Sequence, residues 1–466
     1  IGLGIPAEPL FRSRDNVVQY SEFDNNKAGD HGGAIDWIAH GGKIHDSNFT
    51  RNEAVYGGAI YLNGISSNSS IANVIFDGNR ATKNGGAIDC NASMMGLNNT
   101  LFNNNYAGEY GAALCREANA TGGYGGYNNF TNNHADIAGA ALAWLGVDGI
   151  NINHYIFINN TADLSGGAIY VREDSPNCKV RNSYFDNNHV LDVRVGQGGS
   201  IDWLGDNGYI YNSTFENSFA AIGGTLFVDS DNMNITNSTF EYSFALIRGG
   251  TIAGNAQNAT INDFIINHSV GSGYVDSTGE AYGAGGAIYW ENANNLNISN
   301  AKILEVESHA NGAVSLVNCS DSELHNILFH GEITIRDGGS ISWINSTNVT
   351  VDSCTFEATA ASYNGGAIFL NNVDEVVVKN SDFNNTSALW GNGGAIYVNG
   401  NATFDNNTFD AYNAVDDYAG AIFVAGGTSK ISNSTFIGPD AIWVYKNATG
   451  RLSNNNITGE LPNKHI

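Results

Sequence analysis

Side chains that could catalyse a reaction are scattered along the 466 residues. Inverting glycoside hydrolysis needs two carboxylates roughly 6.5 to 9.5 Å apart, and a lyase needs a base with Ca²⁺ or Arg to hold an acidic sugar. The best candidate pairs are Asp416–Asp417 and Arg336–Asp337, and no Asn-Thr-Asp, Gly-Asp-Asp or Arg-Ile-Lys phrase occurs. We therefore expect no catalytic residue, and the chain is predicted not to be an enzyme.

Histidines and cysteines could bind a metal ion, but their spacing does not indicate one. The eleven histidines are dispersed, and the closest pairs are His40–His45 and His325–His330. The five cysteines are Cys90, Cys115, Cys178, Cys319 and Cys354. None of these spacings is typical of a metal site. We expect neither a metal nor a cofactor.

The elements that would position any site are set by an internal repeat. The phrase Gly-Gly-Ala-Ile-Tyr-Val begins at Gly393, and copies of its first four residues begin at Gly32, Gly57, Gly85, Gly166, Gly285 and Gly365. Looser copies begin at Gly111, Gly139, Gly198, Gly223, Gly249, Asn311, Gly338 and Ala419. Most steps between copies are 25 to 28 residues. Such a period predicts a solenoid whose repeats bury their apolar faces on one another.

A phenylalanine usually precedes the next glycine pair by eight or nine residues. The series is Phe23, Phe49, Phe76, Phe102, Phe130, Phe157, Phe185, Phe215, Phe240, Phe264, Phe329, Phe356, Phe383, Phe409 and Phe436. Three residues later stands an asparagine in the first seven coils, at Asn26, Asn52, Asn79, Asn105, Asn133, Asn160 and Asn188. Asparagine tolerates a left-handed backbone, and its amide can bond the copy one coil along, so this column predicts a bend.

Apolar residues alternate over four to six positions in each phrase, which is typical of strands, and no stretch carries a helical period. The sequence therefore predicts an all-β protein, a single right-handed parallel β-helix of about 16 coils, its handedness taken from the resemblance described next. Residues 1–20 lack the repeat and are expected to cap the first coil, 21–458 to form the β-helix, and 459–466 to form a tail. One interior column should hold Ile35, Ile60, Ile88, Ile169, Ile288, Ile368 and Ile396.

The pairing of Gly-Gly-Ala-Ile with Phe-x-x-Asn resembles two groups of surface proteins over nearly the whole chain. They are the adhesin-like β-helix proteins of methanogenic archaea and the polymorphic outer-membrane proteins of chlamydiae. The run from Asn399 to Phe409 looks most like the archaeal group. The resemblance implies a cell-surface, extracellular β-helix and transfers no catalytic residue.

Charge and hydropathy limit the partners. The net charge is −26, from 20 basic and 46 acidic residues, so nucleic acid and anionic membrane are improbable partners. No apolar run of eighteen residues occurs, so no transmembrane segment is expected. The chain begins at Ile1 with no leader pattern, and we interpret it as a processed chain or a fragment.

Twenty-three Asn-x-Ser/Thr triplets without proline occur between Asn48 and Asn456. An asparagine- and threonine-rich solenoid also generates such triplets by chance. If each phenylalanine points inward, strand alternation places six of these asparagines outward: Asn48, Asn129, Asn212, Asn237, Asn406 and Asn433. We expect N-linked glycans on several of them and none on Asn26, Asn79 or Asn105, which should turn into the bend.

Alternation also places the residue after each repeat isoleucine outward. Near the C-terminus this position reads Phe369, Tyr397, Phe423 and Trp443. Such an aromatic stripe could bind sugar rings or another protein, or could only strengthen the sheet. The longest break in the repeat lies between Phe264 and Gly285, and its loop from Tyr274 to Tyr282 is expected to form a second contact. The same parity places Cys90 inward and Cys115 outward, which disfavours a disulfide between them.

These observations favour a secreted, glycosylated, adhesin-like protein that contacts a surface glycan or protein. One alternative is a structural subunit that assembles with copies of itself into a sheath, layer or filament. The other is a polysaccharide lyase or hydrolase, since right-handed β-helices often carry such enzymes.

Overall fold

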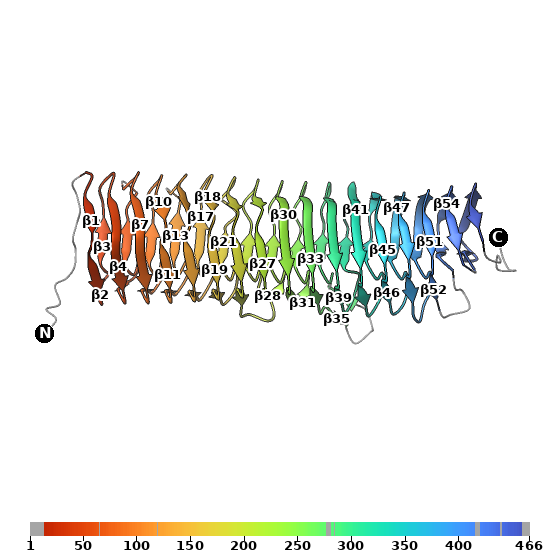
Figure 1. The fold of residues 1–466 in the computed structure, drawn as a ribbon, viewed down its shortest axis with the longest axis horizontal. Helices are drawn as coiled ribbons and strands as arrows, with labels where there is room; N and C mark the ends of the chain where they lie inside the picture. The colour runs from red at the N-terminus through yellow and green to blue at the C-terminus, as the bar shows by residue number, and fades with distance from the viewer. Residues whose placement is uncertain are drawn as a thin grey trace. The chain divides into compact units, whose positions relative to one another are not determined.

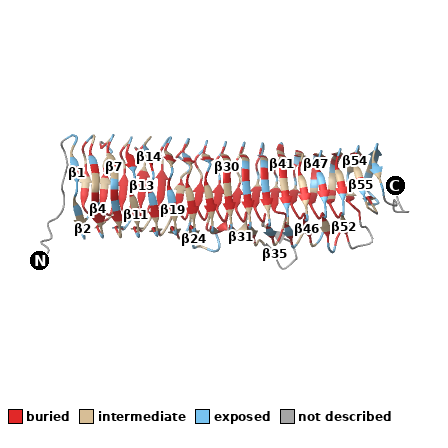
Figure 2. Cartoon of the chain, in the orientation of Figure 1, coloured by how far each residue is buried: buried red, intermediate tan, exposed pale blue. Residues whose placement is uncertain are grey.

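The computed structural model describes residues 14–64, 66–118, 120–275, 281–283, 285–414, 420–438 and 440–458. It is an all-β parallel β-solenoid of about 15 turns, and no residue in these ranges is helical. The chain divides into two compact units, residues 1–233 and 234–466. Within each unit successive turns pair in chain order, and buried residues line the strands (Figures 1 and 2). The predicted fold class is confirmed.

In the first unit each turn contributes strands to four parallel rows. The glycine row, which follows each glycine pair, is β3 (Ile35–Trp37), β6 (Ile60–Leu62), β9 (Ile88–Cys90), β13 (Leu114–Glu117), β17 (Leu142–Leu145), β21 (Ile169–Val171), β25 (Ile201–Trp203) and β29 (Leu226–Val228). The second row is β1 (Val17–Gln19), β10 (Gly96–Asn98), β14 (Tyr124–Gly126), β18 (Asn151–Asn153), β22 (Lys179–Arg181) and β26 (Tyr209–Tyr211). The phenylalanine row is β2 (Glu22–Asp24), β11 (Leu101–Asn103), β15 (Asn129–Thr131), β19 (Ile156–Ile158), β23 (Tyr184–Asp186) and β27 (Thr214–Glu216), while β4 (Lys43–Thr50) and β7 (Ser70–Asp77) span both rows. The short row is β5 (Glu53–Ala54), β8 (Arg80–Ala81), β12 (Tyr106–Ala107), β16 (His134–Ala135), β20 (Thr161–Ala162), β24 (His189–Val190) and β28 (Phe219–Ile222).

The second unit repeats the four rows. Its glycine row is β32 (Ile252–Gly254), β37 (Ile288–Glu291), β40 (Val314–Val317), β43 (Ile341–Ile344), β47 (Ile368–Lys379), β50 (Ile396–Asp405), β53 (Ile422–Gly426) and β56 (Ile442–Val444). The other two long rows are β30 (Asn234–Glu241), β33 (Thr260–Asn267), β38 (Asn297–Leu304), β41 (Ser322–His330), β44 (Thr347–Asp352), β45 (Thr355–Glu357), β48 (Asp382–Asn384), β51 (Thr408–Asp410), β54 (Thr428–Ser432), β55 (Thr435–Ile437), β57 (Thr449–Ser453) and β58 (Asn456–Ile457). The short row is β31 (Phe244–Arg248), β34 (Val270–Gly271), β39 (Glu307–Ser308), β42 (Ile333–Thr334), β46 (Ala360–Ala361), β49 (Ser387–Ala388) and β52 (Asn413–Ala414).

The predicted isoleucine columns are confirmed within each unit. Ile35 pairs in register with Ile60, and Ile60 with Ile88. Ile368 likewise pairs with Ile396 in the second unit. All seven predicted isoleucines have 0% exposure. Pairing at β1 begins at Val17; residues 1–13 and 459–466, which carry most of the expected cap and the tail, lie outside the described residues.

The glycine pair is required by close backbone packing. Gly57 has φ +61°, and a Cβ there would lie 2.2 Å from the carbonyl oxygen of Ile60. At Gly58 a Cβ would lie 2.1 Å from the carbonyl oxygen of Gly86 in the next turn. A Cβ at Gly57 or Gly58 would thus clash with backbone atoms, which explains the glycine pair in this turn, although Ala112 and Ala140 occupy the second position in later turns.

The phenylalanine column stacks ring on ring. Centroids lie 5.1 Å apart for Phe49 and Phe76 and 4.5 Å apart for Phe157 and Phe185, with nearly parallel planes. The assignment of Phe264 to this column is wrong. Ile266, not Phe264, pairs with Phe240, because Phe264 stands two residues earlier on β33.

The asparagine column forms a hydrogen-bonded ladder, as predicted. The Nδ2 of Asn52 donates to the Oδ1 of Asn79 at 2.9 Å, and the Nδ2 of Asn79 donates to that of Asn105 at 3.0 Å. The expectation that these asparagines take the left-handed conformation is wrong. That conformation belongs to the residue before each of them, such as Arg51 with φ 53° and Asn104 with φ 54°. The ladder residue itself must point inward to reach its neighbours.

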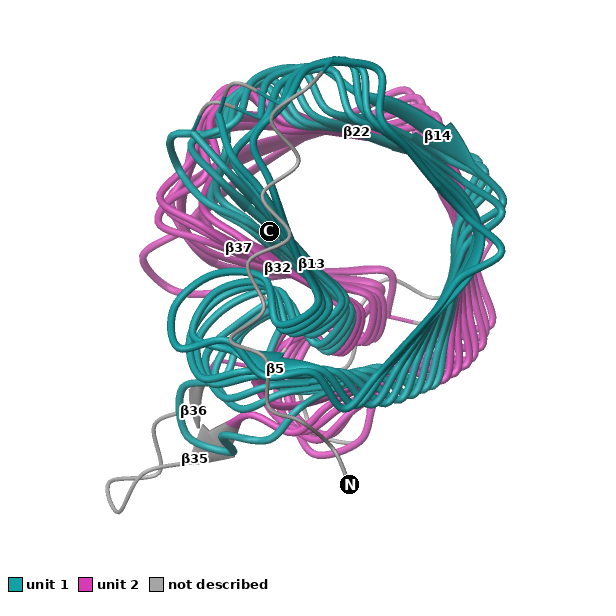
Figure 3. Ribbon diagram, turned by 90° about the vertical axis from the view of Figure 1, so that its left-hand side faces the viewer, with its two compact units in different colours: residues 1–233 teal, residues 234–466 magenta. Residues whose placement is uncertain are grey.

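Both faces of the glycine row are covered. In the first unit, β13 lies between a wide ring that carries β14 and β22 and a narrower lobe that carries β5 (Figure 3). Small side chains fill the lobe, including Ala107, Ala112, Ala135, Ala140 and Ala162. The strand face opposite the isoleucines therefore lies largely against protein, with Asp89, Asp202 and Phe227 buried and Tyr61 and Tyr170 half-buried.

Candidate functional site

The aromatic stripe is a continuous column but is mostly buried. Phe369 pairs in register with Tyr397, Tyr397 with Phe423, and Phe423 with Trp443. The first three rings stack with centroids 5.2 and 5.6 Å apart. Only 8% of Phe369 and 5% of Phe423 are exposed, whereas Tyr397 and Trp443 are half-buried. The expected surface exposure of this stripe is wrong for Phe369 and Phe423.

Phe369 and Phe423 are buried because a lobe of the chain folds over the glycine row. Gly338 lies so close to Phe369 that a Cβ on the glycine would stand 3.0 Å from the Cβ of the phenylalanine. Burial, and then the nearby carboxylate of Asp337, raise the pKa of Tyr397. Strand alternation identified the correct face, but it could not show that the chain covers it. A binding role for these four residues stays a prediction.

The predicted loop contact contains a short hairpin. β35 (Tyr274–Val275) and β36 (Ala281–Tyr282) pair antiparallel, with Tyr274 opposite Tyr282. Residues 276–280 lie outside the described residues.

An exposed apolar surface that the sequence reasoning missed lies in the second unit, in β42 and in the residues that follow the short-row strands β42, β46 and β49. We call Ile333, Ile335, Arg336, Tyr363, Leu389 and Trp390 the Trp390 patch. Its apolar members are 43% to 69% exposed, with Trp390 the most exposed. Counting parity from the buried Ala361 and Ala388, rather than from the repeat isoleucines, would have placed Leu389 outward.

Backbone pairing brings the patch together from three successive turns. The Tyr363 amide donates to the Arg336 carbonyl at 2.9 Å, and the Trp390 amide donates to the Ser362 carbonyl at 2.8 Å. The Arg336 guanidinium lies 5.3 Å from the centre of the Tyr363 ring, within range of a cation–π contact. The patch therefore has a fixed backbone beneath side chains that reach solvent.

All six asparagines predicted to face outward in Asn-x-Ser/Thr triplets are exposed: Asn48, Asn129, Asn212, Asn237, Asn406 and Asn433. Four occupy left-handed corners, with φ between 48° and 55°, at Asn212, Asn237, Asn406 and Asn433. By contrast, Asn79 and Asn105 are buried and Asn26 is half-buried in the ladder. The exposure of these asparagines agrees with their predicted outward or inward orientation. Glycan occupancy stays a prediction.

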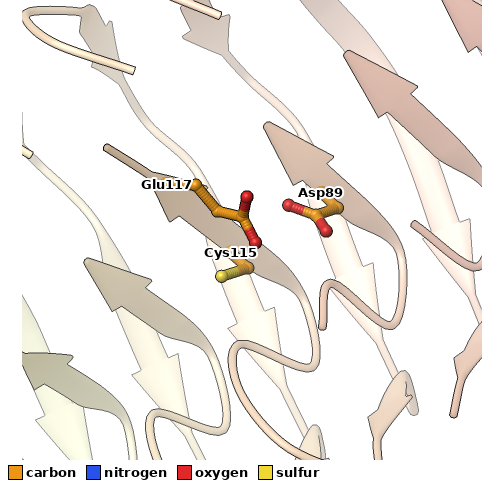
Figure 4. Close-up of side chains that lie close together, drawn as sticks. All are labelled: Asp89, Cys115 and Glu117. Atoms are coloured by element: carbon orange, nitrogen blue, oxygen red, sulfur yellow. The ribbon is translucent and has the colours of Figure 1, made fainter. Parts of the chain in front are cut away.

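A cluster of possible metal ligands lies in the glycine row of the first unit. Cys115 on β13 pairs in register with Asp89 on β9, and Glu117 follows two residues later on the same face (Figure 4). One ligand atom from each residue lies within 4.8 Å of the other two. Asp89 and Cys115 have 0% exposure, and Glu117 is half-buried.

The charge state of this cluster is dominated by burial. Burial, and then the carboxylate of Glu117, raise the pKa of Asp89 well above its usual range. Burial likewise raises the pKa of the Cys115 thiol, with Asp89 and Glu117 adding to the shift. Spacing could have found the cluster, because Cys115 follows Asp89 by 26 residues, which is one turn.

Two further clusters of the same type are more open. His134 lies 3.4 Å from Asp136 and 3.6 Å from Asp163 in the first unit. In the second unit His325 lies 3.6 Å from Asp352, with Glu323 beside them. In both clusters the histidine already lies beside a carboxylate. Cys90 and Cys115 are both free thiols, as the parity argument predicts.

Comparison with known families supports the fold. The family model described as a right-handed β-helix region matches residues 286–459, and the Chlamydia polymorphic membrane protein repeat matches residues 73–91 and 155–172. No curated protein matches the chain. No helix in the described residues is long and apolar enough to cross a membrane.

Several solved structures are similar at low sequence identity. A PL6 family alginate lyase, AlyGC, is 10% identical, with 96% of both chains covered and a TM-score of 0.35. A tailspike protein of E. coli bacteriophage HK620, solved with a pentasaccharide, is 12% identical, with 88% of this chain and 74% of that chain covered and a TM-score of 0.41. A mannuronic acid specific family 6 lyase from the human gut microbiota is 11% identical, with 90% and 87% covered and a TM-score of 0.35. Similarities of this size say nothing about what the chain does.

The chain is thus a parallel β-solenoid with a right-handed β-helix match in its second unit and polymorphic membrane protein repeats in its first.

Proposed function

We propose that this chain is an extracellular surface protein that acts by contact with another protein through the Trp390 patch, rather than by catalysis. The exposure of Trp390, Tyr363 and the aliphatic residues around them carries this proposal. Tryptophan, tyrosine and arginine are the residues that most often dominate binding energy at protein interfaces. The matched polymorphic membrane protein repeats support display at a cell surface.

The composition of the patch favours a protein partner over a glycan. Ile333, Ile335 and Leu389 are 59%, 47% and 43% exposed, so they add aliphatic surface to the patch. A sugar would leave such aliphatic side chains poorly matched, whereas an apolar patch with a polar rim suits a protein surface. A second copy is disfavoured because it carries the same net charge of −26. The fitting partner has a neutral or basic surface.

Binding of the purified full chain to cells tests the proposal. Trp390→Ala and Tyr363→Ala should each weaken adhesion by roughly thirtyfold in Kd, which corresponds to about 2 kcal/mol for a central interface residue. Tyr124→Ala is the matched control, since Tyr124 is 57% exposed on β14 of the first unit. Its adhesion should not change.

Treatment of the target cells separates the partner classes. Protease treatment should abolish adhesion, while periodate oxidation of glycans should leave it intact. Loss after periodate alone would replace the protein partner with a glycan. Assembly of the purified chain into filaments or layers that require Trp390 would favour the structural alternative.

A further inference from the structure

We propose that Asp89, Cys115 and Glu117 bind a divalent transition-metal ion of the Zn²⁺ class, with the side-chain oxygen of Asn84 available as a fourth ligand. The site lies in the first unit and is independent of the Trp390 patch.

Backbone pairing sets the geometry. The register that places Cys115 beside Asp89 also fixes Glu117 on the same side of β13. Their ligand atoms lie within 4.8 Å of one another. In a tetrahedral zinc site, bond lengths of about 2.0 to 2.3 Å place ligand atoms roughly 3.5 Å apart. Small side-chain rotations would therefore close the site around an ion.

The cluster contains buried polar atoms without partners in the described chain. Neither carboxylate oxygen of Asp89 accepts a hydrogen bond, although the residue has 0% exposure. Asn84 is 8% exposed; its Nδ2 donates to Glu117 at 3.1 Å, while its Oδ1 accepts no hydrogen bond. Buried polar atoms are almost always satisfied, so two such side chains at one cluster point to a ligand.

Within the described residues, the Cys115 thiol also lacks the backbone-carbonyl contact that each of the other four cysteine thiols makes. The thiols of Cys90, Cys178, Cys319 and Cys354 each lie within hydrogen-bond distance of a backbone carbonyl oxygen. Within the described residues, no such contact is found for the Cys115 thiol. Its sulfur is therefore the one left to coordinate an ion.

The donor set selects the class of metal. One thiolate with two carboxylates suits a borderline ion such as Zn²⁺ or Co²⁺, whereas Ca²⁺ and Mg²⁺ require a shell of oxygen atoms. An ion would also remove the cost of a buried carboxylate without a partner. Half-buried Glu117 provides the side of the site from which an ion can enter.

Titration of the metal-free, reduced full chain with Co²⁺ tests the proposal. A thiolate-to-cobalt absorption band should appear at one equivalent and disappear when Zn²⁺ is added. Cys115→Ser should abolish the band, and Glu117→Gln should weaken Co²⁺ binding by at least about 10-fold. The two histidine clusters cannot produce this band, because they contain no sulfur.

Two variants serve as controls. Cys90→Ser removes the neighbouring inward thiol, and Asp202→Asn removes a buried acid in the same row that has Tyr170 and Phe227 as register neighbours. Both should keep the band. If Cys115→Ser does not fold, as judged by circular dichroism, the Glu117→Gln titration decides. A missing band in the wild type, an unchanged affinity in Glu117→Gln, or displacement by equal Ca²⁺ would overturn the proposal.

Discussion

At the scale of single residues, buried amides hold the turns together. Asn79 has 0% exposure, and its Oδ1 accepts hydrogen bonds from the Asn52 backbone amide at 3.0 Å and from the Asn52 side chain at 2.9 Å. Its Nδ2 donates to the Phe49 carbonyl at 2.9 Å and to Asn105 at 3.0 Å. Each group would lose a partner if the amide were removed, so the ladder resists substitution.

Asn79→Ala should therefore destabilise the chain by about 3 kcal/mol or more, because several buried groups lose their hydrogen bonds. Urea denaturation followed by circular dichroism measures this. Asn48→Ala, at an exposed position on β4, is the control and should change the free energy of unfolding by less than about 0.5 kcal/mol. Equal effects of the two substitutions would contradict a special role for the ladder.

Glu332 stands three residues after Phe329 in the second unit, where the first unit has the asparagine ladder. It is fully buried, and its side-chain Oε1 accepts a hydrogen bond from the His330 amide at 2.7 Å. Burial raises the pKa of Glu332 from 4.5 to about 8. The folded chain thus keeps a proton that the unfolded chain releases above its ordinary pKa.

Because the folded chain binds this extra proton, its stability falls as the pH rises. The stabilising contribution of Glu332 is fully present below pH 4.5 and is lost as the pH rises toward 8. Glu332→Gln should remove up to about 1.4 kcal/mol per pH unit of this dependence, because glutamine does not titrate. Urea denaturation at pH 5, 6.5 and 8 for both proteins provides the comparison. Parallel curves would show that Glu332 does not hold the proton.

At the scale of elements, the turn into β6 packs so closely on the next turn that it leaves no room for a side chain at Gly58. Gly58 would place a Cβ 2.1 Å from the Gly86 carbonyl oxygen and 2.6 Å from the Arg80 backbone. These are backbone atoms of the next turn, and moving them would break the register that aligns Ile60 with Ile88.

Gly58→Ala should destabilise the chain by at least about 2 kcal/mol because backbone must move to admit the methyl group. Gly29→Ala is the matched control, since a Cβ there meets nothing within 4 Å and φ is not positive. Thermal denaturation should show little change or a slight gain for Gly29→Ala, which restricts the unfolded chain. A stable Gly58→Ala variant would mean that the turns can separate.

At the scale of the whole molecule, a net charge of −26 and the exposed asparagine triplets describe a polar, well-hydrated surface. Protein purified from its native source should carry N-linked glycan on at least two of Asn48, Asn129, Asn212, Asn237, Asn406 and Asn433. Intact-mass measurement and glycopeptide mapping check this, with the ladder residues Asn79 and Asn105 expected to be bare. A native mass equal to that of the polypeptide alone would argue against glycosylation and against secretion through a glycosylating pathway.

The sequence by itself determined the period, the all-β class and the inward columns. These follow from local chemistry: a positive φ and a crowded turn require glycine at Gly57 and Gly58, and alternation then fixes which side each isoleucine and phenylalanine faces. The same rule correctly separated Cys90 from Cys115. It failed at Phe264, where two strand residues could each have filled the column, because only pairing with Phe240 distinguishes them.

The tertiary structure alone decided what lies against each face. Strand alternation predicts that the side chains of Phe369 and Asp89 point away from the isoleucines. Whether these side chains are buried depends on the lobe that packs over them from other parts of each turn. The same packing leaves Trp390 in solvent and brings Asp89, Cys115 and Glu117 together. Contacts between turns join residues about 26 positions apart, and a local pattern carries no information about what covers its outer side.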